Sequence, residues 1–249
     1  MPKTVVFRIK RQAGPDERPY WEEFEIPYQE RLNVLFCLQT IQRNPVTRLG
    51  KPTSAPVWDQ SCLEEVCGAC TMIINGVVRQ ACTALVDDLE QPIVLEPLTK
   101  FPLIKDLMVD RKRFFDDLKK SKTWVAIDGT HALGAGPGCS QELQQIRYAL
   151  ARCMTCGCCL EVCPQYGPER PFVGAAVLAQ VRLFNLHPTG AMQADERLEE
   201  MSKPGGITDC GNAQNCVRVC PKEIPLTESI AALGRQMVGY GLRKFFTKS

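Results

Sequence analysis

The chain has 249 residues, 14 of them cysteine, and a formal net charge of +2 at pH 7. That length is enough for one large domain or two ordinary ones, each able to bury a hydrophobic core. A charge so close to zero provides no basic field for nucleic acid, so no nucleic-acid partner is expected.

The start of the chain and its apolar runs bear on its compartment. Residues 1–8 contain no apolar core of a secretory signal peptide and no Arg/Ser-rich transit sequence. The cysteines are therefore expected to be reduced thiols that bind metal in the cytosol, and not disulfides. The best candidate for a membrane span, Val173 to Leu183, is shorter than the ~18 residues required and contains Gln180 and Arg182. The sequence thus predicts a soluble or peripheral protein.

The N-terminal residues predict a β-hairpin followed by a helix. Residues 5–10 alternate between apolar and polar as in a strand, and a polar turn at 14–16 leads to a second strand around 24–26. Apolar residues at helical spacing follow Asn33, which is predicted to cap the helix, and Pro45 ends it.

Further strands are predicted around a loop that carries cysteines. Residues 71–74 and 77–80 flank Asn75-Gly76, the strongest short hairpin signal, and 93–95 is expected to be the last strand. Two strands, a helix and then a loop that enters the cysteine cluster follow one another in the order of a β-grasp fold. We therefore predict a β-grasp domain over residues 1–108.

The loop carries the first cysteine group, which predicts a 2Fe-2S cluster. Its spacing, Cys-x4-Cys-x2-Cys-x11-Cys, matches plant-type ferredoxins. Gly68 and Ala69 are small enough for the backbone to wrap closely around the sulfides. Structural zinc is the alternative, although zinc sites usually have two Cys-x2-Cys pairs. Cys37, on the apolar face of the predicted helix, is expected to be a buried apolar residue. The predicted ligands are Cys62, Cys67, Cys70 and Cys82.

The second half of the chain predicts an all-helical domain over residues 109–249. No strand pair is evident after Pro102, and Pro171 is placed for the first turn of one of the helices. The remaining cysteines are then expected on loops between helices. The predicted helices cover 110–122, 140–150, 171–181, 195–201 and 226–246.

Two more cysteine groups in this half share one spacing. The second group reads Cys153-x2-Cys156-x2-Cys159-x3-Cys163-Pro164, the run found in bacterial ferredoxins. The third repeats it as Cys210-x2-Ala213-x2-Cys216-x3-Cys220-Pro221, with alanine where one ligand is due.

The repeat predicts which cysteines share a cluster. In two-cluster ferredoxins the cysteine before the proline binds the other cluster. A 4Fe-4S cluster would then have four ligands, whereas the other would have three, because the methyl group of Ala213 cannot bind iron. A 3Fe-4S cluster is predicted there. The predicted ligands are Cys153, Cys156, Cys159 and Cys220 for the four-iron cluster, and Cys163, Cys210 and Cys216 for the three-iron cluster.

Some other residues are weighed as ligands or acid-base groups. The repeat selects Cys159 over Cys158 as a ligand, and Cys139 is expected to be an ordinary thiol. An alternative for the three-cysteine cluster is a 4Fe-4S cube whose open iron acts as a Lewis acid, as in a hydratase. Such an enzyme needs nearby acid-base residues, yet His131 and His187, the only histidines, do not lie beside the cysteines in sequence.

Three different clusters in one chain predict an electron relay, because cluster type and surroundings tune reduction potentials over a wide range. The chain has no G-x-G-x-x-G after a strand, and Gly134 to Gly138 is expected to be a loop. The relay must therefore connect partners on other chains. A redox-sensing or structural metalloprotein is the remaining alternative.

At this point the chain resembles the iron-sulfur subunits of succinate dehydrogenase and fumarate reductase. The resemblance extends over nearly the whole chain and includes all eleven cysteines of the three groups. The amino-acid sequence is most similar to those of menaquinone-type bacterial enzymes. The blocks that carry it are Trp58-Asp59, the segment Cys62 to Cys70, Asn75-Gly76, the segment Asp106 to Arg111, the segment Cys216 to Lys222, Glu25 to Tyr28, and Asn44 to Val46.

The resemblance implies a subunit with no catalytic residue or substrate site of its own. It implies two partners. One is a flavoprotein that carries FAD. The other is a membrane-embedded dihaem cytochrome b with haem b, and menaquinone is the quinone expected to react there. Electrons would pass from flavin through 2Fe-2S, 4Fe-4S and 3Fe-4S to haem or quinone. The chain is expected on the cytoplasmic face of the bacterial membrane, as a peripheral subunit.

Two regions depart from the ubiquinone-reducing members of this family. Those have a tryptophan shortly after the first Cys-Pro and a histidine after the first cysteine of the third group, whereas this chain has Gln165-Tyr166 and Gly211. We therefore do not assign a quinone-binding site to this chain. The basic C-terminal residues 230–248 are expected either to meet anionic headgroups or to pack on their own domain.

Overall fold

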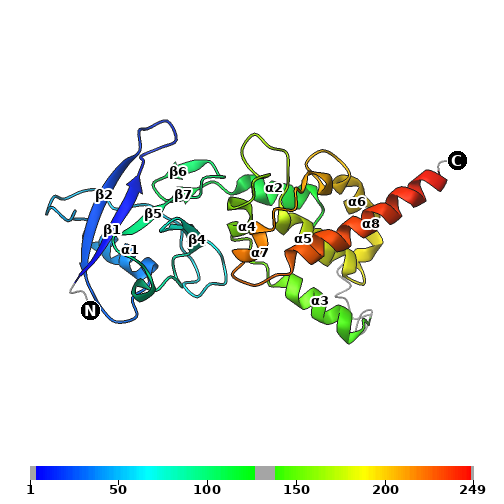
Figure 1. Cartoon of the computed structure of the whole chain (residues 1–249), viewed down its shortest axis with the longest axis horizontal. Coiled ribbons are helices and arrows are strands. Elements are labelled where there is room, and N and C mark those ends of the chain that lie inside the picture. The colour runs from blue at the N-terminus through cyan, green and yellow to red at the C-terminus, as the bar shows by residue number, and fades with distance from the viewer. Residues whose placement is uncertain (1–3, 127–137, 248–249) are drawn as a thin grey trace. The chain divides into compact units, whose positions relative to one another are not determined.

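The computed structural model describes residues 4–126 and 138–247, and they form two compact units. The first unit comprises Met1–Arg111 together with Met154–Glu161, and the second comprises Lys112–Cys153 and Val162–Ser249. Figure 1 labels the helices and strands described below. The predicted domain boundary between residues 108 and 109 stays a prediction. Predicted positions 131 and 134–137, which include one histidine and most of the glycine-rich loop, lie outside the described residues.

The first unit is built on a five-stranded sheet. Its strand order is β2-β1-β5-β3-β4, in which β1 and β5 are parallel and the other pairs antiparallel. The strands are β1 (Thr4–Arg11), β2 (Tyr20–Pro27), β3 (Thr71–Ile74), β4 (Val77–Gln80) and β5 (Ile93–Glu96). The predicted hairpins are confirmed, and the alternating residues of β1 point alternately into and out of the core.

Helix α1 (Val34–Arg43) begins and ends where the sequence predicts. Asn33 caps it, because its Oδ1 accepts a hydrogen bond from the backbone N–H of Phe36 at 2.8 Å. Leu38 and Ile41 are buried with the inward residues of the sheet, and Cys37 is fully buried among them. This core fixes the strands from which the first cysteine loop emerges.

A small second sheet was not predicted. Strands β6 (Leu103–Lys105) and β7 (Met108–Val109) form a hairpin after β5, so the prediction that 93–95 is the last strand is wrong. Its turn depends on Asp106, which has a φ of 49° and whose buried carboxylate accepts hydrogen bonds from Arg11 and the N–H of Val57. These partners are distant in sequence, and short strands of this kind have no periodicity to recognise.

The segment Met154–Glu161, which ends in the short helix α4 (Cys158–Glu161), belongs to the first unit. The buried carboxylate of Glu161 accepts hydrogen bonds from the N–H of Thr99 at 2.9 Å, from its hydroxyl at 2.5 Å and from the N–H of Lys100 at 3.1 Å. Hydrogen bonds from these backbone groups to the charged carboxylate hold this segment on the loop after β5.

Replacing Glu161 by glutamine is expected to lower the free energy of unfolding of the full chain by about 1.5–3 kcal/mol. The substitution removes a charged acceptor and turns an amide N–H toward a backbone donor. Denaturant unfolding followed by circular dichroism measures this. Glu169→Gln, on an exposed residue, is the matched control and should stay within about 0.5 kcal/mol of the unchanged chain. Equal losses in both variants would contradict the role of Glu161.

The described residues of the second unit form helices joined by loops and include no strand. Its helices are α2 (Lys112–Lys120), α3 (Gln141–Ala151), α5 (Ala175–Leu186), α6 (Ala194–Met201), α7 (Asn215–Arg218) and α8 (Leu226–Thr247), and the whole chain also has short 3-10 turns at Val86–Asp88, Gly190–Gln193 and Ile207–Asp209. Helix α5 is the centre of the unit, since α2, α3, α6 and α8 all pack against it. This explains the apolar run from Val173 to Leu183, because most of it lies in α5, which is buried at the centre of the unit.

Two expectations about these helices need correction. Pro171 does not begin α5, because Gly174 has a φ of +90° and the helix starts after it. The cysteines are not confined to loops, since Cys158 and Cys159 begin α4 and Cys216 lies in α7. In the described parts of the chain, no helix is both long and apolar enough to cross a membrane.

Candidate metal centres

The first cysteine loop directs backbone N–H groups at its sulfur atoms. The N–H of Val66 and that of Cys67 donate to the Sγ of Cys62 at 3.2 and 3.3 Å, and the N–H of Ala69 donates to the Sγ of Cys67 at 3.4 Å. Positive φ angles at Leu63, Glu65 and Gly68 turn the chain around these sulfurs. Hydrogen bonds from Glu64 and Val66 lower the pKa of Cys62 to about 7, which favours the thiolate that binds metal.

The other two cysteines of this group lie at the base of a hairpin. Cys70 precedes β3 and Cys82 follows β4, so the antiparallel pairing brings them together, and the N–H of Ala81 donates to the carbonyl of Cys70 at 3.1 Å. Burial raises the pKa of Cys70 to about 12, and the nearby Cys82 thiol also raises it. A buried thiol pair fits a cluster that takes up thiolates, because the positive iron ions offset the burial of negative charge.

The second cysteine group is divided between the two units. Cys156, Cys158 and Cys159 lie in the first, whereas Cys153 and Cys163 lie in the second. A hydrogen bond from the Cys158 thiol lowers the pKa of Cys156 to about 7, while burial opposes this.

Cys158 is placed as a neighbour of the predicted ligands. It is 1% exposed, and the Nε2 of Gln80 on β4 donates to its Sγ at 3.3 Å. The hydrogen bond with Cys156 and burial both raise its pKa far above the ordinary value. The choice of Cys159 over Cys158 as a ligand stays a prediction.

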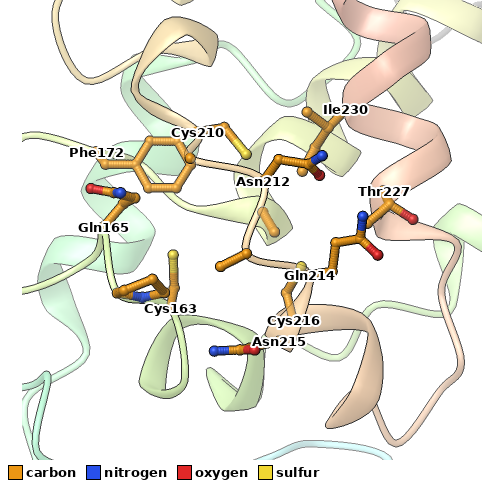
Figure 2. A pocket seen from close by; sticks show the side chains of 14 residues that line it. Cys163, Gln165, Phe172, Cys210, Asn212, Gln214, Asn215, Cys216, Thr227 and Ile230 are labelled. Atoms are coloured by element: carbon orange, nitrogen blue, oxygen red, sulfur yellow. The ribbon is translucent and has the colours of Figure 1, made fainter.

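Three cysteines of the second unit line one cavity. Figure 2 shows the sulfur atoms of Cys163, Cys210 and Cys216 directed toward the same space, which has an empty volume of about 390 Å³ including its opening. Burial raises the pKa of Cys216, and the charges of Cys163 and Cys210 raise it further, as expected for neighbouring sulfurs.

Ala213 lines the same cavity. Its neighbours Asn212 and Gln214 have φ angles of 51° and 61°, so the chain bends sharply on either side of it. Three sulfur donors and a methyl group in place of a fourth fit the chemistry of a three-iron cluster, and this assignment stays a prediction.

The wall that carries Cys163 is fixed by Arg113 of α2. Its guanidinium donates to the carbonyl oxygens of Gly167 and Arg170 at 2.5 Å, and it lies 4.7 Å from the centre of the Tyr166 ring. This support could not be predicted from the sequence, because it depends on a contact between α2 and a loop more than fifty residues away in the chain.

The remaining predicted ligands of the second unit are Cys153 and Cys220. The N–H of Cys153 donates to the carbonyl of Leu150 at the end of α3, and the N–H of Ile224 donates to the Sγ of Cys220 at 3.5 Å. Arg152 donates to the carbonyl of Lys222, so the chain beside Cys153 lies against the chain beside Cys220. The four-iron ligand set as a whole stays a prediction.

Some residues weighed from the sequence have ordinary surroundings. Cys139 is exposed and near the side chains of Gln144 and Arg147. His187 accepts hydrogen bonds at Nδ1 from the N–H groups of Thr189 and Gly190. Both donors belong to the turn that follows α5.

Gly211 is one of the positions at which the sequence departs from the ubiquinone-reducing enzymes, and the structure shows what lies beside it. A Cβ atom on Gly211 would lie 2.6 Å from the Nε2 of Gln165, so the glutamine amide occupies the space beside it. Both residues line the cavity with the three cysteines.

No group of three or more His, Cys, Asp or Glu side chains within residues 4–126 and 138–247 is arranged to hold a single metal ion. Cluster ligands surround a core of several iron and sulfide ions and need not converge on one point. The cysteine-rich donor set, the N–H groups directed at sulfur and the cavity lined by three thiols therefore fit iron-sulfur clusters.

Comparisons with known proteins find two iron-sulfur cluster domains in this chain. A family model described as "2Fe-2S iron-sulfur cluster binding domain" matches residues 6–116, and one described as "4Fe-4S dicluster domain" matches residues 149–224. Among solved structures, a chain of the Mycobacterium smegmatis Sdh1 complex in the apo form has a TM-score of 0.77 at 18% identity and covers 96% of this chain and 97% of that one. These matches confirm the predicted α+β fold class, a β-grasp ferredoxin domain followed by a helical ferredoxin domain.

Curated proteins match over nearly the whole chain. The succinate dehydrogenase iron-sulfur subunit of Bacillus subtilis is 56% identical over 98% of this chain and 96% of its own length. The fumarate reductase iron-sulfur subunit of Wolinella succinogenes is 31% identical over 94% of this chain and 95% of its own length.

Proposed function

Because this chain belongs to the family of succinate dehydrogenase and fumarate reductase iron-sulfur subunits, we propose that it relays single electrons between a flavoprotein subunit and a membrane subunit of such a complex. The observation that carries the proposal is the presence of three cysteine groups with cluster spacing in one chain. The family models confirm the expectation of 2Fe-2S and 4Fe-4S clusters, and the family also carries a 3Fe-4S cluster.

The residues of this chain hold and tune the clusters, which when bound accept and release single electrons. The proposed ligands are those predicted above, with Cys163, Cys210 and Cys216 at the three-iron site. Backbone N–H groups around Cys62 stabilise negative charge on its sulfur and thereby favour the reduced state of the first site.

The finer description of the partners is part of the proposal. The flavoprotein would carry FAD, where succinate and fumarate interconvert, and the membrane subunit would be a dihaem cytochrome b that reacts with menaquinone. The filling of the space beside Gly211 by Gln165 supports a quinone site outside this chain, in the membrane subunit.

Helix α8 supports a peripheral position on the cytoplasmic face of the membrane. Its C-terminal end projects from the unit (Figure 1), and Leu242, Phe245 and Phe246 are exposed there. Arg243 and Lys244 form ion pairs with Asp195 and Glu199 of α6, so the helix is also attached to its own unit. An apolar end with basic residues beside it suits docking on a membrane subunit and anionic headgroups.

Low-temperature EPR of the complex tests this function. A reduced 2Fe-2S signal together with an oxidised 3Fe-4S signal is the expected result, with iron and no stoichiometric zinc by elemental analysis. Substrate-induced broadening of a four-iron signal would instead indicate an open-site hydratase, and zinc without iron would contradict both cluster functions.

A further inference from the structure

Arg111 joins two segments that both carry predicted cluster ligands. Its Nη1 donates to the carbonyl of Gly68 at 2.7 Å and to that of Cys156 at 3.1 Å, and its Nη2 donates to the carbonyl of Ala69 at 2.9 Å. Gly68 and Ala69 lie between the ligands Cys67 and Cys70 of the first group. One guanidinium therefore holds the first cysteine loop and the segment of Cys156, all within the first unit.

The two segments touch where Arg111 holds them. A Cβ atom on Gly68 would lie 2.6 Å from the Cα of Cys156, so the backbones are in direct contact there. The chain after β7 brings Arg111 to this contact, and the three carbonyl oxygens fix its planar fork. Neither segment can shift without breaking at least one of these hydrogen bonds.

The charge of Arg111 lies close to both groups and remains at all working pH values, because a guanidinium is not deprotonated in proteins. Its hydrogen bonds within the described residues go to neutral carbonyl oxygens, and Asp59 acts on it only through its charge. Negative charge on the sulfurs of Cys70, Cys156 and Cys158, as in cluster-bound thiolates, would favour its charged form. In a partly buried site such interactions are stronger than in water.

Reduction adds one negative charge to a cluster, and a fixed positive charge beside it favours that state. Net charge, hydrogen bonds and solvent exposure set cluster potentials. We propose that Arg111 is a positioning residue of the relay, which pins the first cysteine loop to the segment of Cys156 and raises the reduction potentials of both the 2Fe-2S and the 4Fe-4S cluster. This inference rests on the proposed function, since it requires both clusters.

The test is an EPR-monitored redox titration of the complex containing Arg111→Gln or Arg111→Lys. In Arg111→Gln, which loses the charge, the ratio of reduced to oxidised cluster at a fixed potential should fall about tenfold at both sites, a shift of about 59 mV for one electron. In Arg111→Lys, which keeps the charge but cannot span all three carbonyls, a smaller shift of the same sign is expected, about threefold.

Arg197→Gln is the matched control. Arg197 is also a buried arginine, and it donates to the carbonyl oxygens of Lys122, Trp124 and Gly190 in the second unit. Its loss should leave both potentials unchanged even where it lowers thermal stability. The 3Fe-4S potential should be unchanged in both Arg111 variants, because within the described residues Arg111 donates to Gly68, Ala69 and Cys156 and not to the segments of the three-iron ligands.

The outcomes separate this proposal from the function itself. Unchanged 2Fe-2S and 4Fe-4S potentials in Arg111→Gln would overturn it, as would equal shifts in Arg197→Gln. If Arg111→Gln does not take up clusters, potentials of Arg111→Lys that equal those of the unchanged protein would overturn it, and a downward shift supports it. Absence of the clusters from the unchanged complex would instead refute the proposed function.

Discussion

Replacing Ala213 by cysteine is expected to abolish the three-iron EPR signal and to give a 4Fe-4S cluster at that site. Ala213 lines the cavity with Cys163, Cys210 and Cys216 and stands where the repeated spacing calls for a ligand. A fourth thiolate would bind the fourth iron, lower the potential of the site and slow electron transfer to quinone several-fold. EPR of the oxidised complex and its potentiometric titration measure both effects.

Ala175→Cys is the matched control for this prediction. Ala175 is a buried alanine that lines the same cavity from the start of α5, outside the repeated motif. The same substitution there should leave the three-iron signal in place. A persisting three-iron signal in Ala213→Cys would mean that the ligand assignment is wrong, and conversion by Ala175→Cys would mean that the cavity accepts a ligand from either side.

Gly68→Ala is expected to prevent stable binding of the 2Fe-2S cluster and to lower the free energy of unfolding by more than about 3 kcal/mol. The residue has a φ of +69°, which costs an alanine about 1–2 kcal/mol, and the new methyl group would meet the backbone of Cys156 at 2.6 Å. Iron content, visible absorption and denaturant unfolding of the full chain measure the loss.

Gly76→Ala separates the two causes. Gly76 has a φ of +78° in the turn between β3 and β4, but nothing lies within 4 Å of the methyl group that alanine would add. It should cost only the backbone strain, about 1–2 kcal/mol, and should keep its iron. If both variants lose iron alike, the contact with Cys156 is not what requires glycine at position 68.

Local sequence signals predicted the parts of this structure that depend on neighbouring residues. The Asn75-Gly76 turn and the cap at Asn33 need only residues within a few positions. The spacing of the cysteines likewise depends on local loop geometry. The prediction that Cys163, Cys210 and Cys216 belong together used the repeat, and they line one cavity.

The features that were missed depend on partners far along the chain. The hairpin of β6 and β7 is fixed by hydrogen bonds from Arg11 and Val57 to Asp106. Arg111 cannot be distinguished in the sequence from the other charged residues. Its hydrogen bonds to the carbonyl groups of Gly68 and Cys156 become visible only in the folded chain, where those two backbones meet. No periodicity or spacing records such contacts.

The return of Met154–Glu161 to the first unit has a consequence for biosynthesis. Proteins generally fold from the N-terminus as they leave the ribosome, domain by domain. Here the sheet and the first cysteine loop are synthesised before Glu161, which accepts the N–H groups of Thr99 and Lys100, and before Cys156, which meets Gly68. The nascent N-terminal unit therefore stays incomplete while residues 112–153 are translated. During that interval the segment of Cys156 does not yet cover the first cysteine loop.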